Sequence, residues 1–161
     1  MGATTRGFTL IELVTILMLV GVLAIAVVPR FFDSEDFASL GLYDETTSAL
    51  RYAQKAAIAK RRTVCVTFTT TTLTFSLDTS ATGQAACTTT VPMSGPHGTA
   101  PFTVTARRSA TYTNVGGATI TPTAFSINPL GAPSFTSAYT FRVKGLSRNI
   151  TIEPETGYVH A

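Results

Sequence analysis

Glu12 is the residue whose type fits its surroundings least. It lies in the stretch GFTLIELVTILMLVGVLAIAVVPRFFD, residues 7–33, in which nearly every other side chain up to Val28 is apolar. An ionised carboxylate in hydrocarbon is costly and normally persists only where it has a partner or a function. The sequence therefore predicts that Glu12 has either a partner or a function.

Other residues that commonly carry chemistry are few and scattered. Cys65, Cys87, His97 and His160 do not form a set with metal-ligand spacing. No motif joins a nucleophile, a base and an orienting residue, and no glycine-rich loop has the spacing of a phosphate site. We therefore expect no enzyme activity, no metal and no cofactor.

The two cysteines allow one intramolecular pairing, Cys65 with Cys87. If this domain lies outside the cytoplasm, a disulfide closing a loop of this length stabilises it by roughly 3 kcal/mol. The alternative is a pair of buried free thiols. We expect the disulfide.

Size and composition predict one N-terminal helix joined to one small domain. The chain has 161 residues and a mean hydropathy of +0.28, and much of its apolar excess lies between Phe8 and Val28. The remainder is rich in Thr, Ser, Gly and Pro, as in extracellular β-rich domains. The net charge of +3 permits a nucleic-acid or anionic partner without arguing for one.

Residues 8–28 would form a helix about 31 Å long, which matches the hydrocarbon thickness of a bilayer. Arg6 precedes this segment and favours a cytoplasmic N-terminus. Pro29 is expected to kink or loosen the helix. The sequence thus predicts a short leader at 1–7 and a membrane-spanning helix at 8–28.

Residues 29–62 carry apolar side chains at helical spacing. The pattern predicts one long helix from Phe8 to about Arg62, loosened near Gly41, whose second half packs on a sheet. The residues of this face are Phe37, Leu40, Tyr43, Thr47, Leu50, Ala53 and Ala57.

Residues 63–161 have the alternation of a β-domain. Thr63–Asp78 predicts a hairpin that turns near residues 70–72, with Cys65 on the face opposite Val64, Val66 and Phe68. Residues 79–101 are predicted to form a long loop. Further strands are expected at 102–106, 110–115, 119–127, 138–144 and 149–153, with an edge near 157–159. The predicted fold class is α+β, a long N-terminal helix packed on a small antiparallel β-domain.

The N-terminal motif resembles the processing signal of type IV pilins and type II secretion pseudopilins. A short leader ends at Gly7, Phe-Thr-Leu-Ile-Glu follows, and an unbroken apolar run continues from there. The resemblance implies cleavage between Gly7 and Phe8 and N-methylation of Phe8. It also implies that Glu12 sets the register between neighbouring subunits by approaching the charged amino terminus of one of them. The alternative is a Glu12 that only snorkels to the membrane interface.

Two further stretches are similar to minor subunits of these systems. ALRYAQKAAIAKRRTVCV (residues 49–66) and GLSRNITIEPETGYV (residues 145–159) resemble minor pseudopilins of the GspH/FimT kind. RFFDSEDF (residues 30–37) and the two cysteines resemble minor prepilins of the mannose-sensitive haemagglutinin pilus. The resemblance implies a pilin-like fold and a minor subunit near the tip of a pilus or pseudopilus.

The partners implied are a prepilin peptidase, other pilins or pseudopilins, and an inner-membrane assembly platform. The chain would first span the bacterial inner membrane once, with its β-domain in the periplasm, and later enter the filament. One alternative is a membrane-anchored β-domain that never polymerises.

A second alternative, a DNA-binding minor pilin, depends on basic residues that fall on or next to predicted strands. They could grip phosphates if they converge on one face, and otherwise they form an ordinary solvated surface. Tyr139, Phe141 and Tyr112 are the aromatic residues nearest to them in sequence. The basic residues are Arg107, Arg108, Arg142, Lys144 and Arg148.

Overall fold

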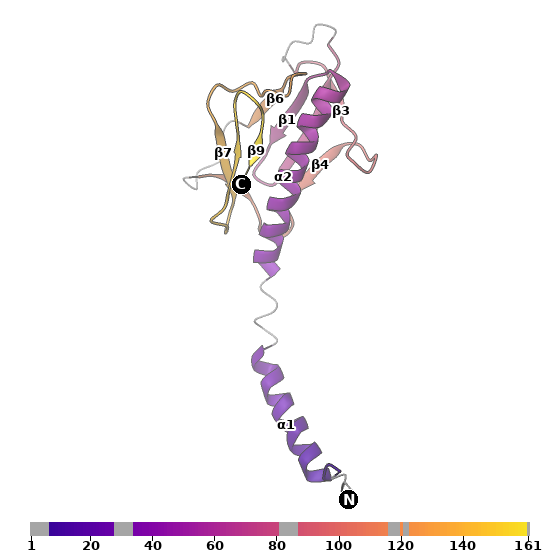
Figure 1. Cartoon of the computed structure of the whole chain (residues 1–161), viewed down its shortest axis with the longest axis vertical. Helices are drawn as coiled ribbons and strands as arrows, with labels where there is room; N and C mark the ends of the chain where they lie inside the picture. Colours follow the sequence, from indigo (N-terminus) through magenta and orange to yellow (C-terminus); the bar gives the residue numbers. More distant parts are fainter. Residues whose placement is uncertain (1–6, 28–33, 81–86, 116–119, 121–122, 161) are drawn as a thin grey trace, which may run out of the picture. The chain divides into compact units, whose positions relative to one another are not determined.

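The computed structural model describes residues 7–27, 34–80, 87–115, 120 and 123–160. The chain divides into two compact units, Met1–Ser34 and Glu35–Ala161. The described part of the first unit is helical, and the second unit combines a helix with β-strands (Figure 1).

The first unit contains one helix, α1 (Leu10–Val27). Thr9 caps it, because the Glu12 N–H donates to Thr9 Oγ1 at 3.3 Å and the Leu13 N–H donates to the Thr9 carbonyl. Glu12 lies in the first turn, where a negative charge complements the helix dipole. The predicted kink at Pro29 and the predicted continuity with the following helix lie outside the described residues.

Within the described part of the chain, no helix is both long enough and apolar enough to cross a membrane.

The second unit begins with α2 (Ser34–Lys60), which runs through Gly41 without interruption. Five residues of the predicted face are buried, namely Tyr43, Thr47, Leu50, Ala53 and Ala57. The prediction is wrong for Phe37 and Leu40, which are 74% and 46% exposed, so the buried face begins after them. The helix ends in a Schellman motif, in which Arg61 has φ +50° and the Arg62 N–H donates to the Ala57 carbonyl.

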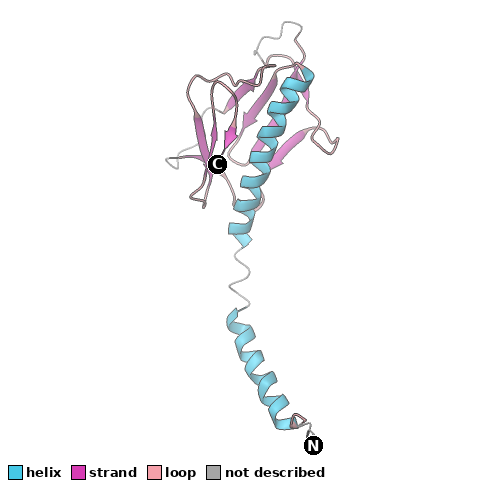
Figure 2. Ribbon diagram, in the orientation of Figure 1, coloured by secondary structure: helices cyan, strands magenta, loops and turns pink. Residues whose placement is uncertain are grey.

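Two antiparallel sheets follow α2 (Figure 2). Sheet A has the order β3-β2-β1-β6, and β4 also pairs with β2. Its strands are β1 (Val64–Phe68), β2 (Thr72–Asp78), β3 (Thr90–Pro92), β4 (Phe102–Thr105) and β6 (Ala124–Ile127). The predicted hairpin is confirmed, with Val66 opposite Phe75.

Sheet B has the order β5-β7-β8-β9. Its strands are β5 (Tyr112–Asn114), β7 (Tyr139–Val143), β8 (Asn149–Ile152) and β9 (Val159–His160). In β7 the side chains of Tyr139, Phe141 and Val143 are buried and alternate with half-exposed ones. Sheet B therefore has one face in the core and one face toward solvent.

Phe68, at the end of β1, joins the two sheets. Its ring lies 5.1 Å from that of Phe141, 5.8 Å from that of Tyr112 and 6.0 Å from that of Phe125, measured between centroids. Edge-on and offset ring contacts of this kind stabilise a core beyond the area that they bury. The α+β fold, with a helix packed on antiparallel sheets, is the predicted one.

The predicted loop at 79–101 needs a correction. It contains β3, which pairs with β2 so that Val91 lies opposite Leu77. The stretch Thr-Thr-Thr-Val-Pro shows no alternation of apolar and polar residues, and its side chains in the strand are exposed, so no periodic signal marked it. Residues 81–86 of this loop lie outside the described part.

Candidate functional site

Gly7 and Phe8 precede α1 and are exposed, with Phe8 78% accessible. A Cβ placed on Gly7 would meet no atom within 4 Å. The described residues therefore give no steric reason for a glycine at this position. A requirement for glycine here would have to come from another protein.

Glu12 is also exposed, on the first turn of α1. Its backbone is satisfied, since its N–H donates to Thr9 Oγ1 and its carbonyl accepts from Thr15 Oγ1 at 2.9 Å. Among the described residues, its carboxylate has no hydrogen bond or ion pair. The Glu12 carboxylate is therefore free to interact with water or with a group of another molecule.

The surface around Glu12 is apolar on every side of α1. A helix that is hydrophobic all round is normally buried by other helices or by lipid. The exposed side chains are Leu10, Ile11, Leu13, Val14, Ile16, Leu17, Met18, Leu19, Val20, Val22 and Leu23. The described residues of this unit contain nothing that covers them.

Cys65 and Cys87 form a disulfide, as expected, with Cα atoms 5.9 Å apart. Cys65 lies opposite Ser76 and Ser126 in the register of sheet A, one residue out of phase with the core residues Val64 and Val66. The bond therefore fastens the loop after β2 to the face of sheet A that is turned away from the aromatic core.

Asp78, at the end of β2, holds the start of the same loop. Its Oδ1 accepts from the Ser80 N–H at 2.8 Å, and its own N–H donates to the Thr63 carbonyl. The hydrogen bonds from Ser80, helped by one from the Cys87 backbone and by the charge of Arg62, hold the pKa of Asp78 below its usual 3.8. Sequence inspection missed this residue, because its role depends on the fold of the loop.

The structure brings the predicted basic residues to one end of the second unit. Arg142 on β7 lies between Thr113 on β5 and Asn149 on β8 in the register of sheet B. Lys144 and Arg148 flank the turn that joins β7 to β8. These three residues therefore share one end of sheet B.

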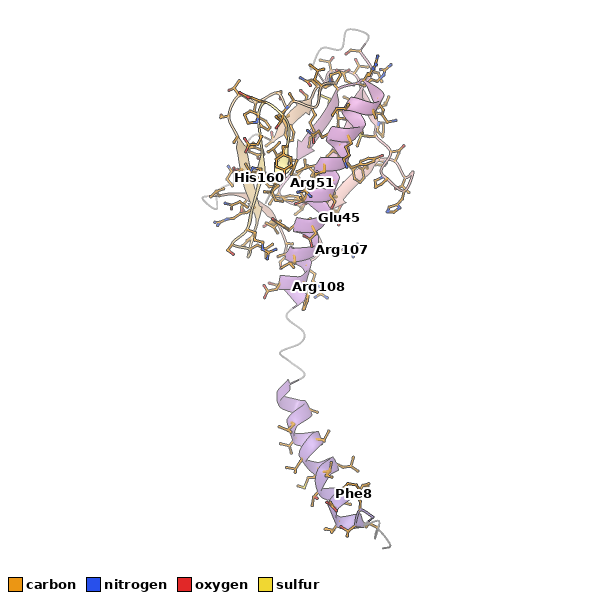
Figure 3. All side chains as sticks on the ribbon, viewed as in Figure 1. Phe8, Glu45, Arg51, Arg107, Arg108 and His160 are labelled. Carbon is orange, nitrogen blue, oxygen red and sulfur yellow. A yellow bond between two sulfur atoms is a disulfide. The ribbon has the colours of Figure 1, made fainter. Side chains whose placement is uncertain are left out.

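Arg107 and Arg108 belong to a neighbouring turn. This turn is closed by the Ala110 N–H, which donates to the Arg107 carbonyl, and the following Thr111 carbonyl accepts from the Lys144 N–H at 2.8 Å. Figure 3 shows both arginines at the end of the second unit at which α2 begins. We call the five residues Arg107, Arg108, Arg142, Lys144 and Arg148 the basic cluster.

Two residues of the basic cluster, Arg142 and Lys144, line an open hollow of about 420 Å³. Its lining consists of Thr113, Arg142, Lys144, Gly145, Leu146 and Ser147, so it includes two cations and no carboxylate. Among the described residues, no side chain of the basic cluster takes part in an ion pair. The hollow is therefore suited to an anionic group.

The aromatic residues near the basic cluster are not available to stack on bases. Tyr112, Tyr139 and Phe141 lie in the core, with exposures of 1%, 8% and 0%. Burial also raises the pKa of the Tyr112 and Tyr139 hydroxyls far above the usual 10. A ligand of the basic cluster would thus meet charges and hydroxyl groups rather than aromatic rings.

His160 on β9 pairs with the Glu153 carboxylate at 2.9 Å. His97 belongs to a different surface, beside Glu45 and Tyr52 of α2. In the part of the chain that the structure describes, no three His, Cys, Asp or Glu side chains gather in a way that could hold a metal.

Comparisons with known proteins give similarity to type IV pilins in both sequence and fold. The chain is 39% identical over 57 residues to PilA5, the major component of the type IV narrow pilus of Thermus thermophilus. This match covers 35% of the chain and spans about half (49%) of the length of that relative. No family model matches the chain.

Among solved structures, the chain resembles the type IV minor pilin FimU of Pseudomonas aeruginosa PAO1. The TM-score is 0.51 at 16% identity, over 79% of this chain and 90% of FimU. A second crystal form of FimU gives a TM-score of 0.47. The fold of the chain is therefore pilin-like, and part of its sequence is similar to a type IV pilin.

Proposed function

We propose that this chain is a structural subunit of a type IV pilus or a related pseudopilus, and not an enzyme. The observation that carries the proposal is α1, an apolar helix exposed on all sides that has one carboxylate, Glu12, in its first turn. Such a surface requires a cover, and a bundle of identical or related helices provides one. The similarity to PilA5 and the FimU-like fold support the same assignment.

Assembly gives Glu12 its role. Cleavage after Gly7 would create a positive α-amino group on Phe8, which the processing enzyme would then methylate. In a filament, the Glu12 carboxylate of one subunit would pair with the amino terminus of its neighbour. A charge pair that is removed from water fixes the axial register of packed helices, because every other register leaves a charge unpaired.

Before assembly, residues 8–28 would hold the chain in the inner membrane, with the second unit in the periplasm. A prepilin peptidase would trim the leader, and an assembly platform would move the subunit into the filament. The absence of steric need for glycine at position 7 supports this step, because the choice of glycine is then left to the peptidase.

Within the filament we place the chain as a minor subunit near the tip. This placement follows the resemblance of residues 49–66 and 145–159 to minor pseudopilins; FimU, which shares the fold, is a minor pilin, whereas the sequence relative PilA5 is a major pilus component. The β-domain would then contact neighbouring minor subunits. Quantitative mass spectrometry of purified filaments tests the assignment, since a tip subunit is rare in the filament and a major subunit dominates it.

The first experiment is the mass of the N-terminal peptide from cells with and without a functional prepilin peptidase. A peptide that begins with N-methylated Phe8, and that disappears when the peptidase is absent, is the expected result. The same uncleaved N-terminus in both cells would contradict the proposal and would leave a membrane-anchored β-domain that does not polymerise.

A second candidate function, nucleic-acid binding, is favoured by the convergence of Arg142 and Lys144 on one hollow. The buried aromatic rings remove the stacking platforms that single strands use, so double-stranded DNA is the form to test. Binding that weakens steeply with salt and is lost in Arg142→Ala would support this function. Salt-independent binding, or none, would remove it.

A further inference from the structure

We propose that the basic cluster docks the second unit on anionic phospholipid headgroups while the chain is held in the membrane. The inference rests on the proposed function, because it needs residues 8–28 to be anchored in a bilayer. Docking on headgroups would provide the basic cluster with a ligand and would hold the subunit in a fixed orientation before assembly.

The position of the basic cluster in the fold is the first step. Ser39, near the start of α2, donates through its hydroxyl to the Lys144 carbonyl at 3.2 Å. One turn further on, the Tyr43 hydroxyl donates to the Asn149 carbonyl at 3.4 Å. The β7–β8 turn is therefore fastened to the first turns of α2.

Under the proposed function, the order of the chain tethers this end close to the bilayer. Ser34, the first residue of α2, follows Val27, the last residue of α1, after a short segment, residues 28–33. With residues 8–28 in a membrane, the start of α2 is held within a few residues of the headgroups. The basic cluster is at that end.

Charge is the second step. The first turn of α2 adds Glu35 and Asp36, both exposed, so this end keeps a surplus of positive charge. Cations within a Debye length of an anionic lipid surface each gain about 1 kcal/mol, which is roughly a fivefold change in binding. The hollow at Arg142 and Lys144 offers room for one phosphate group, with Thr113 and Ser147 as hydroxyl neighbours.

Headgroups fit these observations better than nucleic acid does. The basic cluster is spread over two turns at one end of the unit rather than along a groove, and the nearby rings are buried. The phosphates of a bilayer surface form a flat array, so they can contact cations of the basic cluster that lie on separate turns at the same time. A single-stranded nucleic acid would gain no stacking here.

The experiment uses the full chain reconstituted into vesicles of phosphatidylcholine, either alone or mixed with phosphatidylglycerol. The chain contains no tryptophan, so Ser147→Trp provides a single reporter within the hollow. Leu130→Trp is the matched control, because Leu130 is 87% exposed and its neighbour Gly131 lies beside Ile58, near the other end of α2. Quenching of each reporter by lipids labelled at the headgroup is then measured.

We expect quenching at position 147 to rise when phosphatidylglycerol is present and to fall with added salt, while position 130 stays unchanged. Adding Arg142→Gln and Lys144→Gln should lower the ratio of docked to free chains roughly 25-fold, at about fivefold per cation. Lys55→Gln and Lys60→Gln on α2 remove the same charge elsewhere, and they should leave the quenching at position 147 intact.

Equal quenching at position 147 in both kinds of vesicle would overturn the inference alone. Flotation of the vesicles on a density gradient shows whether the chain is anchored in them. If the chain floats with neither kind of vesicle, the membrane stage of the proposed function is wrong, and the inference fails with it. If double-stranded DNA, without lipid, shifts the emission at position 147 as strongly as phosphatidylglycerol does, the ligand is nucleic acid and the lipid assignment is wrong. A shift without lipid that grows with protein concentration would overturn it in favour of a second copy of the chain.

Discussion

Gly157 is the described glycine of the second unit at which an added Cβ would come closest to another atom. Its φ is +65°, and a Cβ at this position would collide with the Gly131 carbonyl and approach Gln54 Nε2 to 3.1 Å. Gln54 of α2 donates to the Thr156 carbonyl at 2.6 Å, so the helix, the turn at Gly131 and the turn before β9 meet here. No other residue type fits this position without moving the backbone.

We expect Gly157→Ala to lower the free energy of unfolding by about 2 kcal/mol or more, through left-handed strain and the collision with Gly131. Gly41→Ala is the matched control. A Cβ at Gly41 meets nothing, and alanine in a helix interior is favoured over glycine by about 0.5–1 kcal/mol. Urea denaturation measures the free energy of unfolding of both variants. If Gly157→Ala is as stable as the unmodified chain, the turn at Gly157 can shift to accommodate the added Cβ.

Asp78 makes the stability of the second unit depend on pH in the acid range. The pKa of Asp78 is lowered in the folded chain by hydrogen bonds to its charged form. Its contribution is therefore complete above the unfolded value of 3.8 and is lost as the pH falls through the folded pKa.

The prediction follows from comparison with Asp78→Asn. The unmodified chain should lose more stability than this variant as the pH is lowered from neutral to below 3.8, because only the carboxylate can be protonated. Denaturation midpoints across this range measure the difference. Parallel curves for the two proteins would mean that Asp78 does not titrate as the structure indicates.

At the scale of elements, the disulfide fastens a loop that has little apolar material to bury. Cys65 and Cys87 are 22 residues apart, which corresponds to about 3 kcal/mol of loop-closure free energy. We expect Cys65→Ala with Cys87→Ala to lower the free energy of unfolding by that order. Reduction of the unmodified chain should lower its free energy of unfolding by the same amount, whereas reduction of the double variant should not change it. Together these results would assign the effect to the disulfide. An unchanged stability would mean that β3 alone holds the loop.

The elements also show what the sequence can predict. The β1–β2 hairpin, β7 and β8 are marked by alternating apolar residues, and the buried face of α2 by helical spacing, because each pattern reports a local surface that must be covered. β3 has no such signal, because it is a short strand that forms against the unpaired edge of β2. β9 is predicted as an edge near 157–159, and the structure places it at Val159–His160, paired with β8.

The same distinction applies to the candidate site. Gly7, Phe8 and Glu12 form one short motif and can be found by inspection. The basic cluster could be named residue by residue, but its convergence depends on the β5–β7 register and on hydrogen bonds from α2 to the β7–β8 turn. The contact of Arg51 with the Val159 carbonyl depends on long-range packing in the same way, across 108 residues, and no sequence signal could have found it.

For the whole molecule, the proposed function predicts that Glu12 matters to the filament and not to the fold. Glu12→Gln should leave the denaturation of the second unit unchanged, because Glu12 belongs to the other compact unit. Removing one partner of a buried charge pair costs about 3 kcal/mol or more, so incorporation into filaments should fall at least about tenfold. Immunoblots of sheared filaments against whole cells measure this. Thr15→Val, one turn away, is the control, and equal incorporation of Glu12→Gln would contradict the pairing.

The hydrogen bonds between α2 and the C-terminal strands also constrain when the second unit can fold. Arg51 donates to the Val159 carbonyl across a sequence separation of 108, and Tyr43 and Ser39 reach partners 106 and 105 residues away. At roughly 5–20 residues per second of synthesis, α2 waits about 5–20 seconds for the strands that cover it. During that interval the chain emerging from the ribosome has an uncovered apolar helix face and no closed core. Under the proposed function, this is the unfolded form that a narrow translocation channel accepts. The hydrogen bonds from α2 to the C-terminal strands form only after β8 and β9 have been synthesised.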